Sequence, residues 1–198
     1  MNLKSKNYTL IVVVFIIGCT LSVYLLFKYK SPNERELIID YYNLVEDKVN
    51  KATLHDIPLI NEERDTISIS QLVGLKKLIY RISDLHCNSC VLNEFENLKS
   101  ILSKYNIESN NIVIIGFYQN LRHLKIFRRI NRLENFEIYN LLDSNIGLEA
   151  DILDMPYFFV LNKNLSVEST FIPTKDANQK TQNYLISSLN KVKSSKSN

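Results

Sequence analysis

Two cysteines separated by two residues, Cys87 and Cys90, form the part of the sequence best equipped for chemistry. A strand-forming run precedes them and a helical pattern begins at them, so the first cysteine is expected at a helix N-terminus. Unpaired backbone N–H groups and the positive end of the helix dipole stabilise a thiolate there and lower the pKa of the cysteine. The second cysteine, one helical turn further on, is placed to resolve a mixed disulfide. The pair therefore predicts thiol–disulfide exchange.

Two structural interpretations of the pair are weaker. A structural zinc site needs two further ligands, but the sequence has no second Cys-x-x-Cys pair, and His55, His86 and His123 lack ligand spacing. A structural disulfide between Cys87 and Cys90 would close a very short loop, which removes little chain entropy. Redox activity is therefore the better hypothesis.

Hydrophobic spacing predicts the elements that position the cysteines. Residues 77–83 are β-prone, and apolar residues recur at helical spacing from Val91 to Leu102. Further strands are expected at 66–70, 111–118, 136–142, 157–161 and 167–172, and further helices at 33–51, 121–133, 146–152 and 177–192, with a short helical turn at 71–74. Strands that alternate with helices predict an α/β sandwich with a central sheet and crossover helices.

The first thirty residues are predicted to hold a membrane anchor. No charge occurs from Asn7 to Phe27, which is long enough for a helix to cross the roughly 30 Å hydrocarbon core, and Lys6 and Lys28 flank the segment. A retained span is the favoured interpretation. A lipoprotein signal acylated at Cys19 is the second, and a cleaved signal peptide is the third. We expect a single-pass protein of the bacterial cytoplasmic membrane whose C-terminal domain faces the periplasm or the cell exterior.

The remaining chain is expected to comprise a juxtamembrane helix or stalk at 31–54, one domain at 55–192 and a disordered tail at 193–198. The formal net charge is +3, and the four lysines among residues 1–30 leave the remainder near neutral, which argues against nucleic-acid binding. One expected helix is strongly basic. Its cations are Arg122, Lys125, Arg128, Arg129 and Arg132. We expect them to form a solvated face, with contact to anionic lipid or an acidic partner as the alternative.

Met155 and Pro156 directly precede the strand expected at 157–161. Together with the Cys-x-x-Cys pair at a strand-to-helix junction, this arrangement resembles the thioredoxin superfamily. The N-terminal anchor and the additional helix and strand from Leu121 to Leu142 are similar to those of the TlpA/ResA-type membrane-anchored thiol–disulfide oxidoreductases. The resemblance covers about residues 55–192.

This resemblance implies a three-layer sandwich with a central mixed sheet. It implies that Cys87 and Cys90 are catalytic, that a cis peptide bond precedes Pro156, and that Met155 and Pro156 bind extended substrate. It also implies an activity without a cofactor or metal. The expected partners are protein disulfides or dithiols and an upstream electron donor in the membrane.

The sequence departs from the family pattern near the cysteines. His86 stands where the family usually has Trp, and Arg81 falls where thioredoxin keeps a buried acid, so the proton-transfer role of that acid is not carried over. A protonated His86 is hypothesised to stabilise the Cys87 thiolate. Asp84 and Glu94 are expected to be solvated.

Two other functions compete with the expected reduction of protein disulfides. The cysteine pair could bind a soft ion such as Cu(I) for assembly of a respiratory enzyme, although the sequence offers no obvious third ligand. The chain could also be a tethered interaction domain without catalysis.

Overall fold

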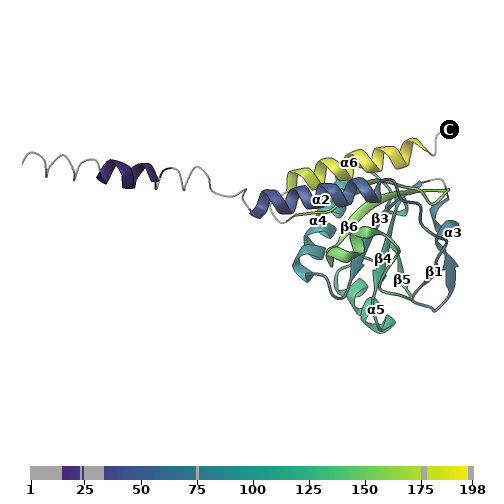
Figure 1. Cartoon of the computed structure of the whole chain (residues 1–198). Helices are drawn as coiled ribbons and strands as arrows, with labels where there is room; N and C mark the ends of the chain where they lie inside the picture. Colours follow the sequence, from purple (N-terminus) through teal and green to yellow (C-terminus); the bar gives the residue numbers. More distant parts are fainter. Residues whose placement is uncertain (1–14, 23, 25–33, 75, 175–177, 196–198) are drawn as a thin grey trace, which may run out of the picture. The chain divides into compact units, whose positions relative to one another are not determined.

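The structure, a computed structural model, describes residues 15–22, 24, 34–74, 76–174 and 178–195 (Figure 1). The chain divides into two compact units, residues 1–41 and 42–198. In the first unit, residues 15–22 are helical. Among the described residues, no helix is long and apolar enough to cross a membrane. Most of the predicted anchor lies outside the described residues.

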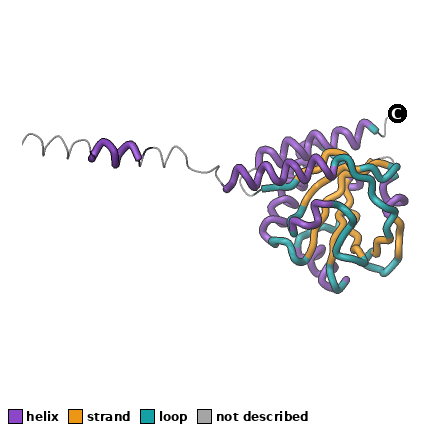
Figure 2. The backbone as a smooth tube through the Cα atoms, in the orientation of Figure 1, coloured by secondary structure: helices purple, strands orange, loops and turns teal. Residues whose placement is uncertain are grey.

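The second unit is built on a seven-stranded mixed sheet, ordered β2–β1–β5–β4–β3–β6–β7. β3, β4 and β5 are parallel neighbours, and the other pairings are antiparallel. Figure 2 shows the strands running through the middle of this unit. The strands are β1 (Pro58–Ile60), β2 (Thr66–Ser68), β3 (Lys76–Ser83), β4 (Ile112–Phe117), β5 (Glu137–Leu141), β6 (Tyr157–Asn162) and β7 (Val167–Phe171).

Helices connect and cover these strands. α4 joins β3 to β4 and α5 joins β4 to β5, so both crossovers between parallel neighbours lie on the same face of the sheet. The helices are α2 (Glu34–Val49), α3 (Ile69–Val73), α4 (Asn88–Tyr105), η1 (Ser109–Asn111), α5 (Leu121–Ile130), η2 (Glu149–Leu153) and α6 (Asn178–Ser194). α6 enters the segment expected as a tail, and residues 196–198 lie outside the described residues.

Alternating side chains of the central strands fill two cores. Leu78, Tyr80 and Ile82 of β3 pack into one core with α4, α5 and α6. Ile79 of the same strand packs into the other core with residues 42–49 of α2, α3 and η2. Two helical layers therefore enclose one sheet, which confirms the predicted α/β sandwich with a central mixed sheet.

The C-terminal half of α2 belongs to the second unit. Val45 and Val49 are buried in its core. The Glu46 carboxylate accepts a hydrogen bond from the backbone N–H of Ile172 at 2.7 Å, just beyond β7. The compact unit therefore starts at Tyr42, upstream of residue 55, where the sequence alone placed the beginning of the domain.

Candidate active site

β3 and α4 place the two cysteines at one edge of the sheet, the edge where the parallel strands β3 and β4 end. β3 lies between β4 and β6 and is buried from Leu78 to Ser83. After three loop residues, Cys87 caps the N-terminus of α4, and its carbonyl oxygen accepts hydrogen bonds from the N–H groups of Cys90 (3.0 Å) and Val91 (3.1 Å). Cys87 is exposed and Cys90 is half-buried. The first thiol is therefore open to solvent, with the second one helical turn behind it.

The start of α4 favours negative charge on Cys87. The first N–H groups of a helix have no partner within the helix, and the helix dipole is positive at this end. The first turn contains no acidic residue that would oppose a thiolate. The Ser89 hydroxyl lies 3.2 Å from the Cys87 sulfur and can donate a hydrogen bond to a thiolate. Cys87 and Cys90 are both reduced, and a reduced cysteine attacks a disulfide as its thiolate.

The His86 side chain is half-buried against the domain. Its backbone N–H donates to the Ser83 carbonyl at 3.2 Å, and its buried Nδ1 atom has no hydrogen-bond partner. Burial, with a smaller contribution from the nearby positive charge of Arg81, lowers the pKa of His86 to about 4. The imidazole is therefore neutral near pH 7, so the hypothesised cationic effect on Cys87 would operate only in acid.

Arg81 forms a buried charge cluster behind the cysteine loop. Its side chain is 2% exposed, and its Nε lies 3.3 Å from Oδ1 of Asp151 in η2, close enough for an ion pair although not aligned as a hydrogen bond. The guanidinium also donates to the carbonyl oxygens of Ile82 and Ser144, the latter at 2.5 Å. Oδ1 of Asp151 accepts a further hydrogen bond from the Tyr157 hydroxyl at 3.0 Å. The cluster therefore links β3, η2 and the start of β6.

Glu94 is a candidate that the sequence analysis missed. It was expected to be solvated, but the residue is only 4% exposed, one helical turn after Cys90. Burial raises the pKa of Glu94, and hydrogen bonds from the side-chain amides of Asn97 (3.1 Å) and Asn93 (3.3 Å) partly oppose this shift. Position 94 borders the apolar stripe of α4, and this is the only signal in the sequence that it would turn inward.

Tyr80 lies beneath the first turns of α4. Burial raises the pKa of Tyr80 well above its ordinary value, and the charges of Glu94 and Cys90 raise it further. Its hydroxyl points to the Val91 carbonyl at 3.4 Å. Tyr80 is therefore a neutral hydroxyl within electrostatic range of both Cys90 and Glu94.

Met155 and Pro156 lie at the same sheet edge as the cysteines. Arg81 and Tyr157 form the last pair of the antiparallel β3–β6 ladder, and Met155 and Pro156 directly precede Tyr157. Pro156 is buried, and the Met155 sulfur accepts a hydrogen bond from the Tyr42 hydroxyl at 2.9 Å.

The expected cis peptide bond before Pro156 is wrong. In the described part of the chain no peptide bond is cis, so the bond that precedes Pro156 is trans. Bonds before proline favour trans by only about 0.5–1 kcal/mol, so the surrounding backbone decides the isomer. Here Asp154, with a φ of 48°, ends η2 and turns the chain into β6.

Among the described residues, no group of three or more His, Cys, Asp or Glu side chains is arranged to hold a metal ion. The third cysteine, Cys19, belongs to the first unit and is exposed. The site is therefore a cysteine pair with buried charged neighbours.

The fold and the cysteine pair define an α/β sandwich with a dithiol at the sheet edge. No family model matches the sequence, and a comparison with curated proteins found no match. Solved structures do match. A Chlorobium tepidum protein described as a thiol:disulfide interchange protein DsbE shares 14% identity, over 70% of this chain and 96% of that chain, with a TM-score of 0.51.

Two further similar structures have lower TM-scores. The thioredoxin domain of a Bacteroides vulgatus thiol-disulfide oxidoreductase shares 11% identity over 68% of this chain and 96% of that chain, with a TM-score of 0.47. A secreted Mycobacterium tuberculosis disulfide oxidoreductase shares 14% identity over 71% and 98%, with a TM-score of 0.46. On the match to the Chlorobium protein, this chain has the thioredoxin fold.

Proposed function

We propose that this chain is a membrane-anchored, extracytoplasmic thiol–disulfide oxidoreductase that reduces disulfides in other proteins. The observation that carries the proposal is the exposed Cys87 at the N-cap of α4, with Cys90 one turn behind it. The activity named for the Chlorobium protein, thiol:disulfide interchange, uses two thiols, and this site supplies two.

The first step is attack on the substrate. The Cys87 thiolate attacks one sulfur of a substrate disulfide, which breaks the substrate S–S bond and forms a mixed disulfide. The other substrate sulfur leaves as a thiolate and takes a proton from water. The N-terminus of α4 and the Ser89 hydroxyl stabilise the attacking charge.

The second step releases the substrate. Cys90 loses its proton and attacks the Cys87 sulfur, so a Cys87–Cys90 disulfide forms and the second substrate thiolate leaves. The substrate gains two electrons and two protons, and the protein loses them. We propose that the carboxylate form of Glu94, one turn from Cys90, accepts the Cys90 proton, since burial brings the pKa of Glu94 closer to that of a thiol.

Met155 and Pro156 are proposed to contact the substrate chain next to the scissile disulfide. They lie at the edge where β6 begins beside the end of β3, and the Tyr42 hydroxyl fixes the Met155 side chain. A substrate strand that pairs here would present its disulfide to Cys87.

The location of the domain is also a proposal. The uncharged segment from Asn7 to Phe27, flanked by lysines, supports a retained signal anchor, with acylation of Cys19 as the alternative. An oxidised Cys87–Cys90 pair needs two electrons before the next cycle. We propose that a membrane electron donor supplies them as a dithiol.

Reduction of insulin by the full-length protein, with dithiothreitol as the recycling reductant, tests this function. The wild type should accelerate insulin precipitation, whereas Cys87→Ser and Cys90→Ser should reduce catalysis to the uncatalysed rate. Cys19→Ser is the matched control and should retain wild-type activity, because it removes a cysteine outside the pair. A wild type that is no faster than dithiothreitol alone would remove the proposal.

A further inference from the structure

A basic stripe runs along the outer face of α5. Arg122, Lys125 and Arg129 are all exposed, and their i, i+3, i+7 spacing places them on one side of the helix. The opposite side packs inward through Leu124 and Phe127. The stripe is therefore solvent-facing, and the core does not use it.

Acidic residues lie beside this stripe, but those that the structure describes form no ion pair with its three cations. Arg128 forms an ion pair with Glu62 at 3.2 Å and donates to the Glu134 carbonyl at 2.9 Å. Within the described part of the chain, Arg122, Lys125 and Arg129 form no ion pair. Residues 121–132 hold five cations and no acid, whereas the whole chain has a formal net charge of +3. The positive charge of the second unit is thus concentrated on α5 and the turn that follows it.

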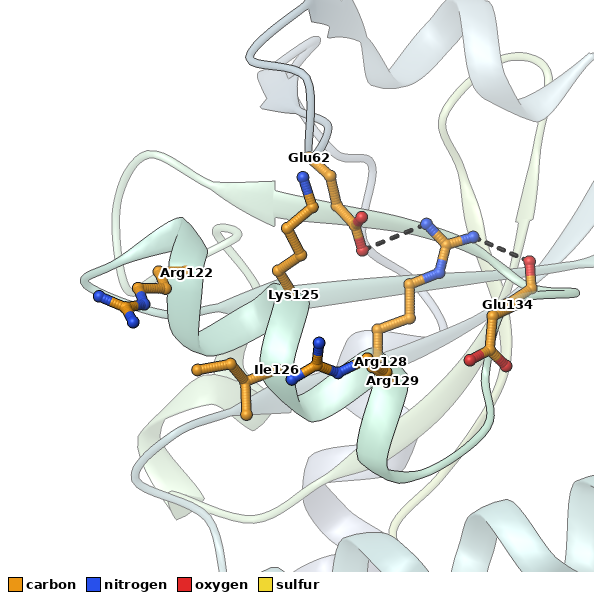
Figure 3. A pocket seen from close by; sticks show the side chains of 7 residues that line it. All are labelled: Glu62, Arg122, Lys125, Ile126, Arg128, Arg129 and Glu134. Carbon is orange, nitrogen blue, oxygen red and sulfur yellow. Dashed lines mark hydrogen bonds and ion pairs between the residues drawn. The ribbon is translucent and has the colours of Figure 1, made fainter.

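Two isoleucines accompany the cations. Ile126 is half-buried, and Ile130 is 69% exposed. Figure 3 shows Arg122, Ile126 and Arg129 extending away from Glu62, whereas Lys125 extends toward it. A groove of about 620 Å³ lies along this helix, and its lining includes the three cations of the stripe and the acidic residues Glu62 and Glu134. Its volume is within the size range of small-ligand sites and large enough for a phospholipid headgroup.

We propose that this face of α5 docks on an anionic lipid bilayer. Cations spaced along a helix attract anionic headgroups, and isoleucines between them can enter the boundary with the acyl chains. The same chain carries the lysine-flanked apolar segment from Asn7 to Phe27, and a tether to a bilayer makes a weak second contact effective. A protein partner fits less well, because the face lacks the exposed aromatic anchors that dominate protein interfaces.

Docking through α5 would bring the cysteine edge near the bilayer. β3 and β4 are parallel, so α4 and α5 both begin at the same edge of the sheet. Arg122, in the first turn of α5, therefore lies at the edge that carries Cys87. A redox partner embedded in the membrane could then reach the cysteines, while a soluble substrate would not depend on this contact.

The absence of tryptophan from the chain provides a sensitive test. Ile130→Trp places a unique fluorophore on an exposed position of the face. The full-length variant is reconstituted into phosphatidylcholine vesicles with or without phosphatidylglycerol, in each case with brominated acyl chains that quench nearby tryptophan. We expect a blue shift and quenching only with phosphatidylglycerol. Both should reverse in 1 M salt, where the Debye length falls to about 3 Å.

A charge variant and a matched control test the stripe itself. Combining Ile130→Trp with Arg122→Gln, Lys125→Gln and Arg129→Gln should weaken the docked state on the order of 100-fold. The same reporter with Lys51→Gln, Lys104→Gln and Lys163→Gln removes equal charge elsewhere on the exposed surface and should stay quenched. Insulin reduction should be unchanged in both variants, which separates this proposal from the proposed activity.

Three outcomes would overturn lipid docking. The first is equal quenching in neutral and anionic vesicles, and the second is full quenching in the α5 charge variant. The third is a reporter that ignores anionic vesicles but shifts when polyglutamate is added, which would assign the face to an acidic protein partner. Circular dichroism of each variant shows whether the fold is retained, and the substituted positions are exposed or partly exposed.

Discussion

The buried ion pair between Arg81 and Asp151 predicts a large loss of folding stability when either charge is removed. Their side chains are 2% and 7% exposed, so removal of one charge leaves the other without compensation in a low-dielectric environment. Loss of one partner from a buried ion pair costs about 3–5 kcal/mol. Arg81→Met should therefore lower the free energy of unfolding by about this amount near neutral pH. Urea unfolding followed by far-UV circular dichroism measures it.

The pH dependence of this loss has a definite sign. Burial raises the pKa of Asp151 above 3.8, against opposing contributions from Arg81, Tyr157 and backbone N–H groups. A raised carboxyl pKa contributes stability below 3.8 that is lost as the pH rises through the folded-state pKa. Removing Arg81 raises that pKa further. The deficit of Arg81→Met should therefore be largest near neutral pH and shrink as acid protonates Asp151.

A double variant makes the test sharper. Asp151→Asn alone leaves a buried guanidinium that cannot lose its proton, so its deficit should also be large near neutral pH. It should shrink in acid, where protonation of Asp151 leaves the same guanidinium uncompensated in the wild type. Arg81→Met with Asp151→Asn removes both charges and should lie within about 1–2 kcal/mol of the wild type. An Arg81→Met deficit below about 1 kcal/mol, or single losses that simply add in the double variant, would refute the argument.

Three further predictions concern Glu94, His86 and Asn140. Glu94→Gln should slow release of the substrate from the mixed disulfide on the order of 10²-fold in stopped-flow kinetics, while the rate of Cys87 alkylation by iodoacetamide stays unchanged. Equal effects on both steps would contradict a role of Glu94 at Cys90. His86 has a pKa of about 4, below its ordinary 6.5, so the wild type loses stability as the pH falls from 6.5 through 4. His86→Gln should flatten this part of the pH–stability curve, and an unchanged slope would count against burial of the ring. The buried Asn140 side chain accepts from the Tyr118 N–H at 2.8 Å and donates to its carbonyl at 3.0 Å, so Asn140→Ala should destabilise the fold by about 1–3 kcal/mol in thermal unfolding, whereas substitution of the exposed Asn164 should have little effect.

Local patterns in the sequence were sufficient for the strand and helix around the cysteines. The predicted strand at 77–83 is β3, and the apolar spacing from Val91 to Leu102 marks the inward face of α4. Both patterns depend only on neighbouring residues and on burial, so they survive in the folded chain.

Features that depend on contacts between distant segments were not predictable. Arg81 and Asp151 are far apart in the sequence, and their pairing depends on the sheet register and on the position of η2. The burial of Glu94 depends on how α4 is rotated on the sheet, which places a polar residue at the border of the apolar stripe. The trans bond before Pro156 depends on the turn at Asp154, which no local pattern specified.

The central claim is that Cys87 attacks a disulfide and Cys90 completes the exchange. Its most direct test is mass spectrometry of the full-length Cys90→Ser variant after incubation with a disulfide substrate. We expect a stable mixed disulfide on Cys87, whereas the wild type should pass through it to a Cys87–Cys90 disulfide and released thiols. The absence of an adduct on Cys87, or an equally fast adduct on Cys90 in the Cys87→Ser variant, would contradict the account.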